Sequence, residues 1–147
     1  MRFMILIKAS KESEAGIQPT KEQFEAMAKY NEQLVKAGVM VAGEGLLSSS
    51  NGARVKFSGD KRTVIDGPFT ETKELVAGFW ILQVKSKEEA IEWVKRIPFG
   101  PGTPYEDQGE PEIEIRQIAE LADFQAITPE LEKRFEDLRA KTEAPRS

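Results

Sequence analysis

The chain has 147 residues, a formal net charge of −4 and neither cysteine nor histidine. The length suits one domain with its own core, and the missing residue types exclude disulfides, thiol nucleophiles and histidine as a general base or metal ligand. Acids and bases are interleaved without a basic stripe, and the short apolar N-terminus has neither membrane-spanning length nor a signal-cleavage pattern. We therefore expect a cytoplasmic protein without metal or bound cofactor that binds neither nucleic acid nor membrane.

The first elements expected are a strand and a helix. Residues 2–8 form an apolar run of strand length, and residues 10–19 read as a polar loop. Thr20 and Gln23 have the spacing of a capping box, so a helix begins there, and Gly38 stands where a glycine ends a helix. The spacing predicts that the apolar face of this helix carries Phe24, Met27, Leu34 and Val35.

Strand patterns dominate the middle of the chain. Residues 39–47 read as a strand with two internal glycines, which indicate a bulge or a close backbone approach. Residues 54–57 and 62–65 flank a short SGDK turn, as in a β-hairpin. Residues 78–84 form another apolar strand.

A second helix and a last strand follow. Ser86 and Glu89 form a second capping-box pair, and the helix they begin stops before Pro98. A loop rich in proline and glycine, residues 98–111, leads to residues 112–118, which alternate as a strand buried on one face does.

The tail, residues 119–147, has a different pattern. Thr128 as N-cap and Pro129 as first helical residue predict a third helix. Its apolar stripe is narrow, and the last residues, 142–147, are expected to fray. The stripe consists of Leu131, Phe135 and Leu138.

This order of elements predicts an α+β fold: a ferredoxin-like sandwich with an antiparallel sheet, two helices on one face and a C-terminal helical extension. The two strands at 2–8 and 78–84 are apolar on both faces and would form the central pair. Because helices cover only one face, the other must meet something else, and a second copy of the sheet is the simplest cover. The sequence thus predicts a homodimer; the alternative is that the tail helix folds back over that face.

Three segments carry a family resemblance: VIDGPFTETK at 64–73, GEGL at 43–46 and WVKRIP at 93–98. In this combination and spacing, residues 1–118 resemble the YCII-related domain family, in particular the branch named for its DGPF motif. The resemblance implies a domain at 1–118 with the fold of a dimeric α+β barrel, a cleft between sheet and helices, and a tail outside the family pattern.

The resemblance also bears on activity. Short members of the family carry a histidine and an aspartate that are proposed as an acid–base pair, and the histidine position aligns with Met27, so that pair cannot form here. Related dimeric barrels include monooxygenases and isomerases that work without a metal. Genes of the DGPF branch often lie beside those of extracytoplasmic-function sigma factors, which suggests a regulatory association.

Two carboxylates are candidates for chemistry. Asp66 ends an apolar strand against glycine and proline, where partial desolvation would raise the pKa of a carboxyl group and suit it to acid–base catalysis. The alternative is an Asx-turn, in which Asp66 accepts backbone N–H groups. Glu44 lies between two glycines that would let a ligand approach the backbone, or it is an outward-facing charge at a bulge.

Further residues are candidates for ligand binding. Asn31 is a polar group on the apolar side of the first helix, with Tyr30 beside it, and is otherwise an exposed or backbone-bonded amide. Arg54 could anchor an anion or be a solvated strand charge. Phe69, Phe79 and Trp80 offer aromatic walls, or belong to the core or the dimer interface.

Together these residues suggest a small-molecule-binding homodimer. If it is an enzyme, Asp66 would be the catalytic group of a cofactor-independent proton transfer or addition–elimination. The alternative is a non-catalytic ligand sensor or protein-interaction module associated with transcription. The predicted substrate-binding residues are Tyr30, Asn31, Glu44, Arg54, Phe69 and Trp80.

Overall fold

The computed structural model describes residues 1–143, so most of the tail end expected to fray lies outside the described residues. The chain divides into two compact units, Met1–Gln117 and a second unit that begins at Ile118. The first unit contains β1 (Arg2–Lys8), α1 (Lys11–Glu14), α2 (Lys21–Lys36), β2 (Met40–Gly45), β3 (Ala53–Ser58), β4 (Lys61–Asp66), β5 (Val76–Gln83), α3 (Lys87–Lys95) and β6 (Ile113–Gln117), with 3-10 turns at Ser49–Asn51 and Thr72–Glu74.

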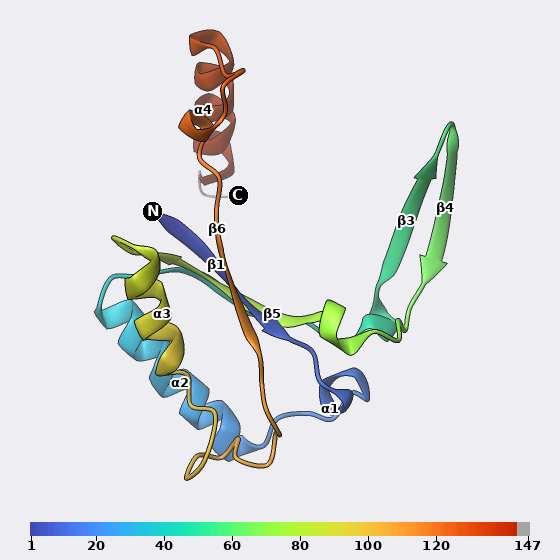
Figure 1. Ribbon diagram of the computed structural model, residues 1–147, viewed down its shortest axis with the longest axis vertical. Coiled ribbons are helices and arrows are strands. Elements are labelled where there is room, and N and C mark those ends of the chain that lie inside the picture. Colours follow the sequence, from blue (N-terminus) through green and yellow to red (C-terminus); the bar gives the residue numbers. More distant parts are fainter. Residues whose placement is uncertain (144–147) are drawn as a thin grey trace. The chain divides into compact units, whose positions relative to one another are not determined.

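The main sheet has four antiparallel strands in the order β2-β5-β1-β6, and β3 pairs with β4 as a separate two-stranded hairpin (Figure 1). The central pair is β1 and β5, as the sequence predicted, with Ile5 opposite Trp80. Both α2 and α3 pack on one face of this sheet. The first unit is therefore the expected ferredoxin-like sandwich, with the hairpin inserted between β2 and β5.

The core lies between the sheet and these two helices. Phe3, Ile5 and Leu82 from the central strands are almost completely buried, and Leu34 of α2 and Ala90 of α3 are fully buried against them. Alternate residues of β1 point to one face, so burial of Phe3 and Ile5 fixes which face the helices cover.

The apolar face of α2 is rotated from the predicted one. Phe24 and Val35 are 60% and 65% exposed, so the prediction was wrong for these two residues, although Leu34 is buried. The buried stripe instead includes Gln23 and Tyr30. The physical reason is that both residues combine an apolar stem or ring with a polar end that finds a partner: the Gln23 side-chain amide donates to the Pro104 carbonyl at 3.0 Å.

The helix ends largely follow the sequence. The Thr20–Gln23 capping box forms, and Gly38 has a φ of +73° beyond the end of α2. Ser86 caps α3 as expected, but the Glu89 carboxylate accepts from the Lys85 amide at 2.8 Å instead of completing the box.

A short helix replaces part of the expected polar loop. The α1 segment begins at a reciprocal pair in which Ser10 and Ser13 each accept from the other's backbone amide. Serine spaced in this way provides the same two bonds as the Ser/Thr–Glu pattern, so the local sequence supports a helical turn here.

The second unit contains a 3-10 turn at Leu121–Asp123 and α4 (Pro129–Glu143). Thr128 caps α4 by accepting from the Leu131 amide at 3.2 Å, as predicted. The narrow stripe of Leu131, Phe135 and Leu138 is 37%, 51% and 56% exposed. Within residues 1–143, no helix combines the length and the apolar character needed to cross a bilayer.

Tyr30 joins the two helices and the sheet. Its hydroxyl donates to the Trp93 carbonyl at 2.8 Å, and its ring meets the edge of Trp80 at a centroid distance of 5.4 Å. Burial raises the pKa of Tyr30 to about 12, against a small opposing effect of Arg96.

This pKa predicts how Tyr30→Phe changes stability with pH. The folded-state pKa lies above the unfolded value near 10. The contribution of the Tyr30 hydroxyl to the free energy of unfolding is therefore complete below about pH 10 and is lost as pH rises through about 12. At neutral pH the variant should lose about 1–3 kcal/mol, since the Trp93 carbonyl loses its partner.

Urea unfolding of both proteins from about pH 8 to about pH 11.5 measures this difference. It should shrink at the alkaline end, while Tyr105, present in both, cancels. A difference that stays constant or grows with pH would contradict the assignment.

Candidate functional site

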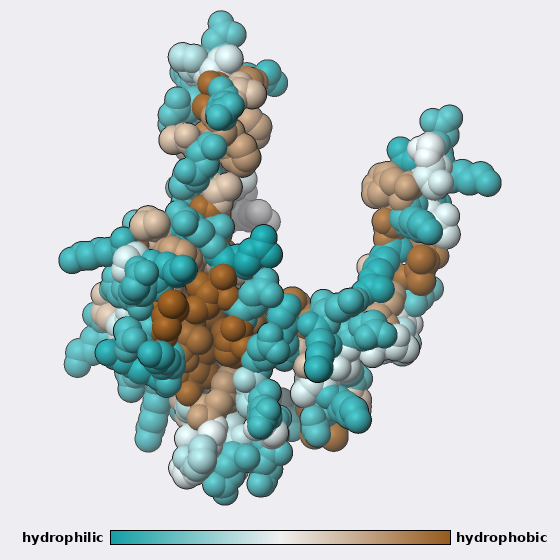
Figure 2. Space-filling view, in the orientation of Figure 1, coloured by the Kyte–Doolittle hydropathy of each residue, from teal (hydrophilic) through white to brown (hydrophobic). Residues whose placement is uncertain are grey.

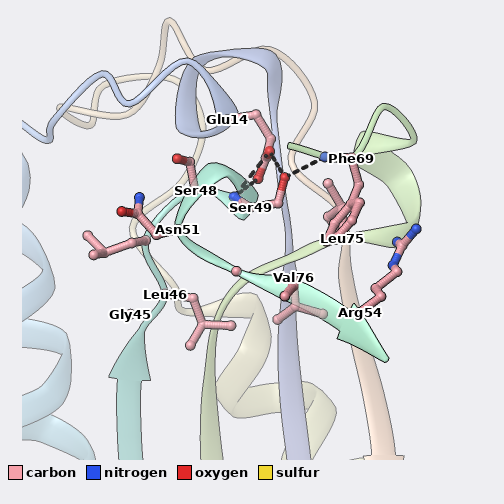
Figure 3. Close-up of a pocket in the computed structure, with 13 residues that line it drawn as sticks. Glu14, Gly45, Leu46, Ser48, Ser49, Asn51, Arg54, Phe69, Leu75 and Val76 are labelled. Atoms are coloured by element: carbon pink, nitrogen blue, oxygen red, sulfur yellow. Dashed lines mark hydrogen bonds between the residues drawn. The ribbon is translucent and has the colours of Figure 1, made fainter. Parts of the chain in front are cut away.

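The first unit contains a cavity of about 550 Å³ where the end of β2 meets the start of β3 (Figure 3). Its apolar walls come from Leu46, Leu47, Phe69, Leu75 and Val76. The polar and charged side chains that line it are those of Glu14, Ser48, Ser49, Asn51 and Arg54.

Ser49 holds three segments together at this cavity. Its backbone amide donates to Glu14 Oε1 at 3.0 Å, and its hydroxyl donates to Glu14 Oε2. The same hydroxyl accepts from the Phe69 amide at 2.9 Å, as the dashed lines of Figure 3 show. The turn after β2, the end of α1 and the DGPF segment are thereby fixed to one another.

Gly67 of the DGPF segment packs directly on this turn. A Cβ atom at Gly67 would lie 1.7 Å from the Ser49 carbonyl oxygen, and the Gly67 amide donates to the Gly52 carbonyl at 3.0 Å. The Gly67–Pro68 peptide bond is cis. Only glycine fits at this position, because the neighbouring atoms are backbone and cannot move aside cheaply.

Gly67→Ala should therefore loosen the cavity wall. We expect a loss of stability of at least about 2 kcal/mol, because the added methyl group forces two backbone segments apart. Hydrogen exchange of the Phe69 amide should accelerate as well, and thermal unfolding gives the global change.

The matched control is Gly52→Ala. The Cβ added there would lie 3.5 Å from the same Ser49 oxygen, an ordinary contact. Equal effects of the two substitutions would show that the contact at Gly67 is not the cause.

Among the described residues, Arg54 contributes the one cationic side chain of the cavity lining. Its guanidinium stacks on the Phe69 ring, with Cζ 3.8 Å from the ring centroid. Among residues 1–143 no carboxylate forms an ion pair with Arg54. The Glu14 carboxylate, by contrast, already accepts from Ser49. The lining therefore presents one uncommitted positive charge beside an aromatic ring.

The structure brings together two of the residues predicted from the sequence, Arg54 and Phe69, and places the candidate catalytic group next to them. Asp66 ends β4 opposite Ala53, a lining residue, but its own side chain is exposed and does not line the cavity. Within the described part of the chain, the Asp66 carboxylate has no hydrogen-bond partner.

Tyr30, Asn31 and Trp80 form a separate group within the helix–sheet layer. Trp80 Nε1 donates to Asn31 Oδ1 at 2.8 Å, so the sheet supplies the partner that this amide needs. A second hollow of about 490 Å³ lies beside Asn31 and is lined by Ala28, Asn31, Glu32, Val35, Lys36 and Met40.

Glu44 and Gly43 lie within the sheet, whereas Gly45 at the end of β2 lines the cavity. Glu44 is exposed on β2 opposite Phe79. A Cβ atom at Gly43 would meet Trp80 Cδ1 at 2.7 Å, so the close approach expected at this glycine is made by a core side chain. The register shift of β2 falls between Met40 and Ala42, just before the glycines.

Sequence reasoning missed Glu14 and Ser49. Both lie in segments that read as polar loops, and the bond between them spans 35 residues. The Ser10–Ser13 pair was a signal for α1, which positions Glu14, but no local pattern connects α1 to the turn after β2. Within residues 1–143 no group of three or more potential metal-ligating side chains occurs.

Comparison with known proteins gives three findings. A family model described as YCII-related domain matches residues 1–107. An uncharacterized protein of Rhizobium meliloti (strain 1021) is 29% identical over 71 residues, which cover 48% of this chain and 57% of that protein. The match thus spans little more than half of that relative.

The third finding is a solved structure, 5-chloro-2-hydroxyhydroquinone dehydrochlorinase from Burkholderia phenoliruptrix AC1100 in complex with 2,5-dihydroxybenzoquinone. It is similar with a TM-score of 0.43 and 17% identity, over 81% of this chain and 94% of that one. Membership of the narrower DGPF branch stays a prediction.

Proposed function

Because this chain belongs to the YCII-related domain family, as its motifs predicted, we propose that it is a small-molecule-binding protein that works as a homodimer. The cavity beside Arg54 and Phe69 is the proposed ligand site. The observation that carries the proposal is the unpaired guanidinium held over an aromatic ring at a cavity of about 550 Å³. Cavities of this size take small organic molecules.

The lining indicates the chemistry of the ligand. Leucine, valine and phenylalanine side chains suit an apolar or aromatic body, and Arg54 offers paired N–H donors to a planar anion such as a carboxylate. The Glu14 carboxylate already accepts two hydrogen bonds from Ser49, which leaves it fewer acceptor positions for a ligand, whereas Arg54 forms no ion pair within the described residues. An aromatic or branched aliphatic carboxylate is the class that fits best.

Arg54→Met tests this assignment. Binding of single-ring aromatic carboxylates, screened by thermal shift and titrated by calorimetry, should weaken at least about tenfold in the variant, because a charge-assisted hydrogen bond of about 1.5–3 kcal/mol is lost. The corresponding neutral amides should bind the unmodified protein less tightly than the acids.

Lys56→Met is the matched control, since Lys56 lies two residues along the same strand and is absent from the cavity lining. It removes the same charge and should bind the acids normally. Equal binding of acids and amides, or equal losses in both variants, would refute the role of Arg54.

The same ligands distinguish catalysis from sensing. If the protein is an enzyme, the exposed Asp66 carboxylate beside the cavity wall is the proposed acid–base group. Incubation with a bound ligand, followed by mass spectrometry, should then show conversion that Asp66→Asn abolishes while binding persists. A ligand sensor would return every ligand unchanged.

The homodimer is proposed from the uncovered face of the main sheet. Met4 and Leu6 alternate with the buried Phe3 and Ile5, so they point away from the helices, and they stand opposite Ile81 and Phe79. These four side chains are only partly buried. Figure 2 shows a different hydrophobic group, gathered between β6 and α3 of Figure 1 at the edge of the helix–sheet layer and surrounded by hydrophilic side chains.

Leu6→Glu should dissociate this dimer. Leu6 stands between Phe79 of β5 and Glu114 of β6, so a second carboxylate there would have to be desolvated beside a like charge on pairing, which is costly. Sedimentation velocity should show a dimer for the unmodified protein and a monomer for the variant.

Val35→Glu, an equivalent change at an exposed position of α2, is the control and should remain dimeric. A dimer that survives Leu6→Glu would show that another surface pairs.

A further inference from the structure

The β3–β4 hairpin is the least supported element of the first unit. All twelve residues of its two strands are exposed, and among the described strands β3 and β4 pair only with each other. A two-stranded hairpin without a third strand or a packed helix is marginally stable in water. Packing against another surface would therefore stabilise this hairpin.

The register divides the hairpin into two different faces. Val55 stands opposite Val64, and Phe57 stands opposite Arg62, whose guanidinium lies 4.5 Å from the Phe57 ring centroid. Val55, Phe57 and Val64 are 51%, 69% and 64% exposed. Successive residues alternate between faces, so the opposite face carries Arg54, Lys56, Ser58, Lys61, Thr63 and Ile65.

We propose that the apolar face of this hairpin, Val55, Phe57 and Val64, packs against a second copy of the chain as an arm. The inference rests on the proposed homodimer and adds a contact that the sheet pairing alone does not contain.

Charge indicates that the occupant is a second copy. The hairpin carries four basic residues and two acidic ones in a chain whose formal net charge is −4, so the remainder of the chain carries −6. A basic arm is attracted to such an acidic surface on another copy. A polyanion such as DNA or an anionic membrane would be attracted by the arm but repelled by the rest of the chain, which makes it the less favoured partner.

The chain also offers a complementary receptor. β2 is an edge strand of the main sheet, and Val41, Leu46 and Leu47, in or just after it, are 50%, 50% and 80% exposed. Glu44 of the same strand is exposed and forms no ion pair within the described residues. An apolar edge with one free carboxylate matches the apolar face of the arm, on which Arg62 lies beside Phe57. Edge strands generally need such protection.

This contact would cover part of the rim of the ligand site. Leu46 and Leu47 line the cavity as well as the β2 surface, so an arm seated there would lie at the cavity rim of the other copy. The partner copy would thus help to close a site that is open in a single chain.

Hydrogen exchange at different protein concentrations tests the arm directly. Backbone amides of residues 53–66 should exchange rapidly when the protein is diluted to monomer and should be protected in the dimer. The core amides of β1 and β5 should show little change, because their hydrogen bonds lie within one chain.

A pair of variants provides the second measurement. The double substitution Phe57→Ser with Val64→Ser removes the apolar face and should raise the dimer dissociation constant at least tenfold. Lys56→Ser with Thr63→Ser alters the opposite face of the same two strands and should raise it much less. Both leave the core untouched, so thermal unfolding of the first unit should be preserved in each.

The outcomes separate the arm from the dimer on which it rests. If a dimer forms and Leu6→Glu dissociates it, but hairpin exchange is equal in monomer and dimer, the arm is refuted and the sheet pairing stands. If the unmodified protein is monomeric at all concentrations, both are refuted. Protection of the hairpin that appears only on adding duplex DNA or anionic vesicles would also overturn the proposal.

Discussion

The close contact between Gly67 and the Ser49 carbonyl is the constraint on which the candidate site depends. It brings the DGPF segment against the turn after β2, and the Ser49 hydroxyl then bonds both the Phe69 amide and Glu14. Phe69 is thereby placed under Arg54, and the cavity wall is complete. A larger side chain at residue 67 would displace every one of these groups, because backbone atoms face it on the far side.

The cavity lining contains two charged side chains: the Glu14 carboxylate, which is hydrogen-bonded to Ser49, and the Arg54 guanidinium, which has no ion-pair partner among the described residues. Glu14 accepts from the amide and the hydroxyl of Ser49, and this is a structural use of a carboxylate. Arg54 has no such partner within the described residues and rests on an aromatic face, which tolerates a cation without neutralising it. This asymmetry, more than the shape of the cavity, favours an anionic ligand.

The same alternation that builds the core leaves surfaces uncovered. Phe3 and Ile5 bury one face of β1, so Met4 and Leu6 are left on the other. Within the first unit, Met1–Gln117, no layer covers either face of the hairpin, and Val55, Phe57 and Val64 remain exposed. Burying apolar area stabilises a protein in proportion to that area, so both surfaces favour assembly, and the proposed dimer would use them together.

The sequence by itself determined the two-helix sandwich, the central β1–β5 pair, the hairpin and most helix ends, because these follow from short-range periodicity and capping. It also singled out Arg54 and Phe69, but only tertiary structure placed them together and separated them from Tyr30, Asn31 and Trp80. Glu14 and Ser49 were invisible to sequence reasoning, since their bond joins residues 35 positions apart. Contacts of that kind depend on how loops pack, and no local pattern encodes them.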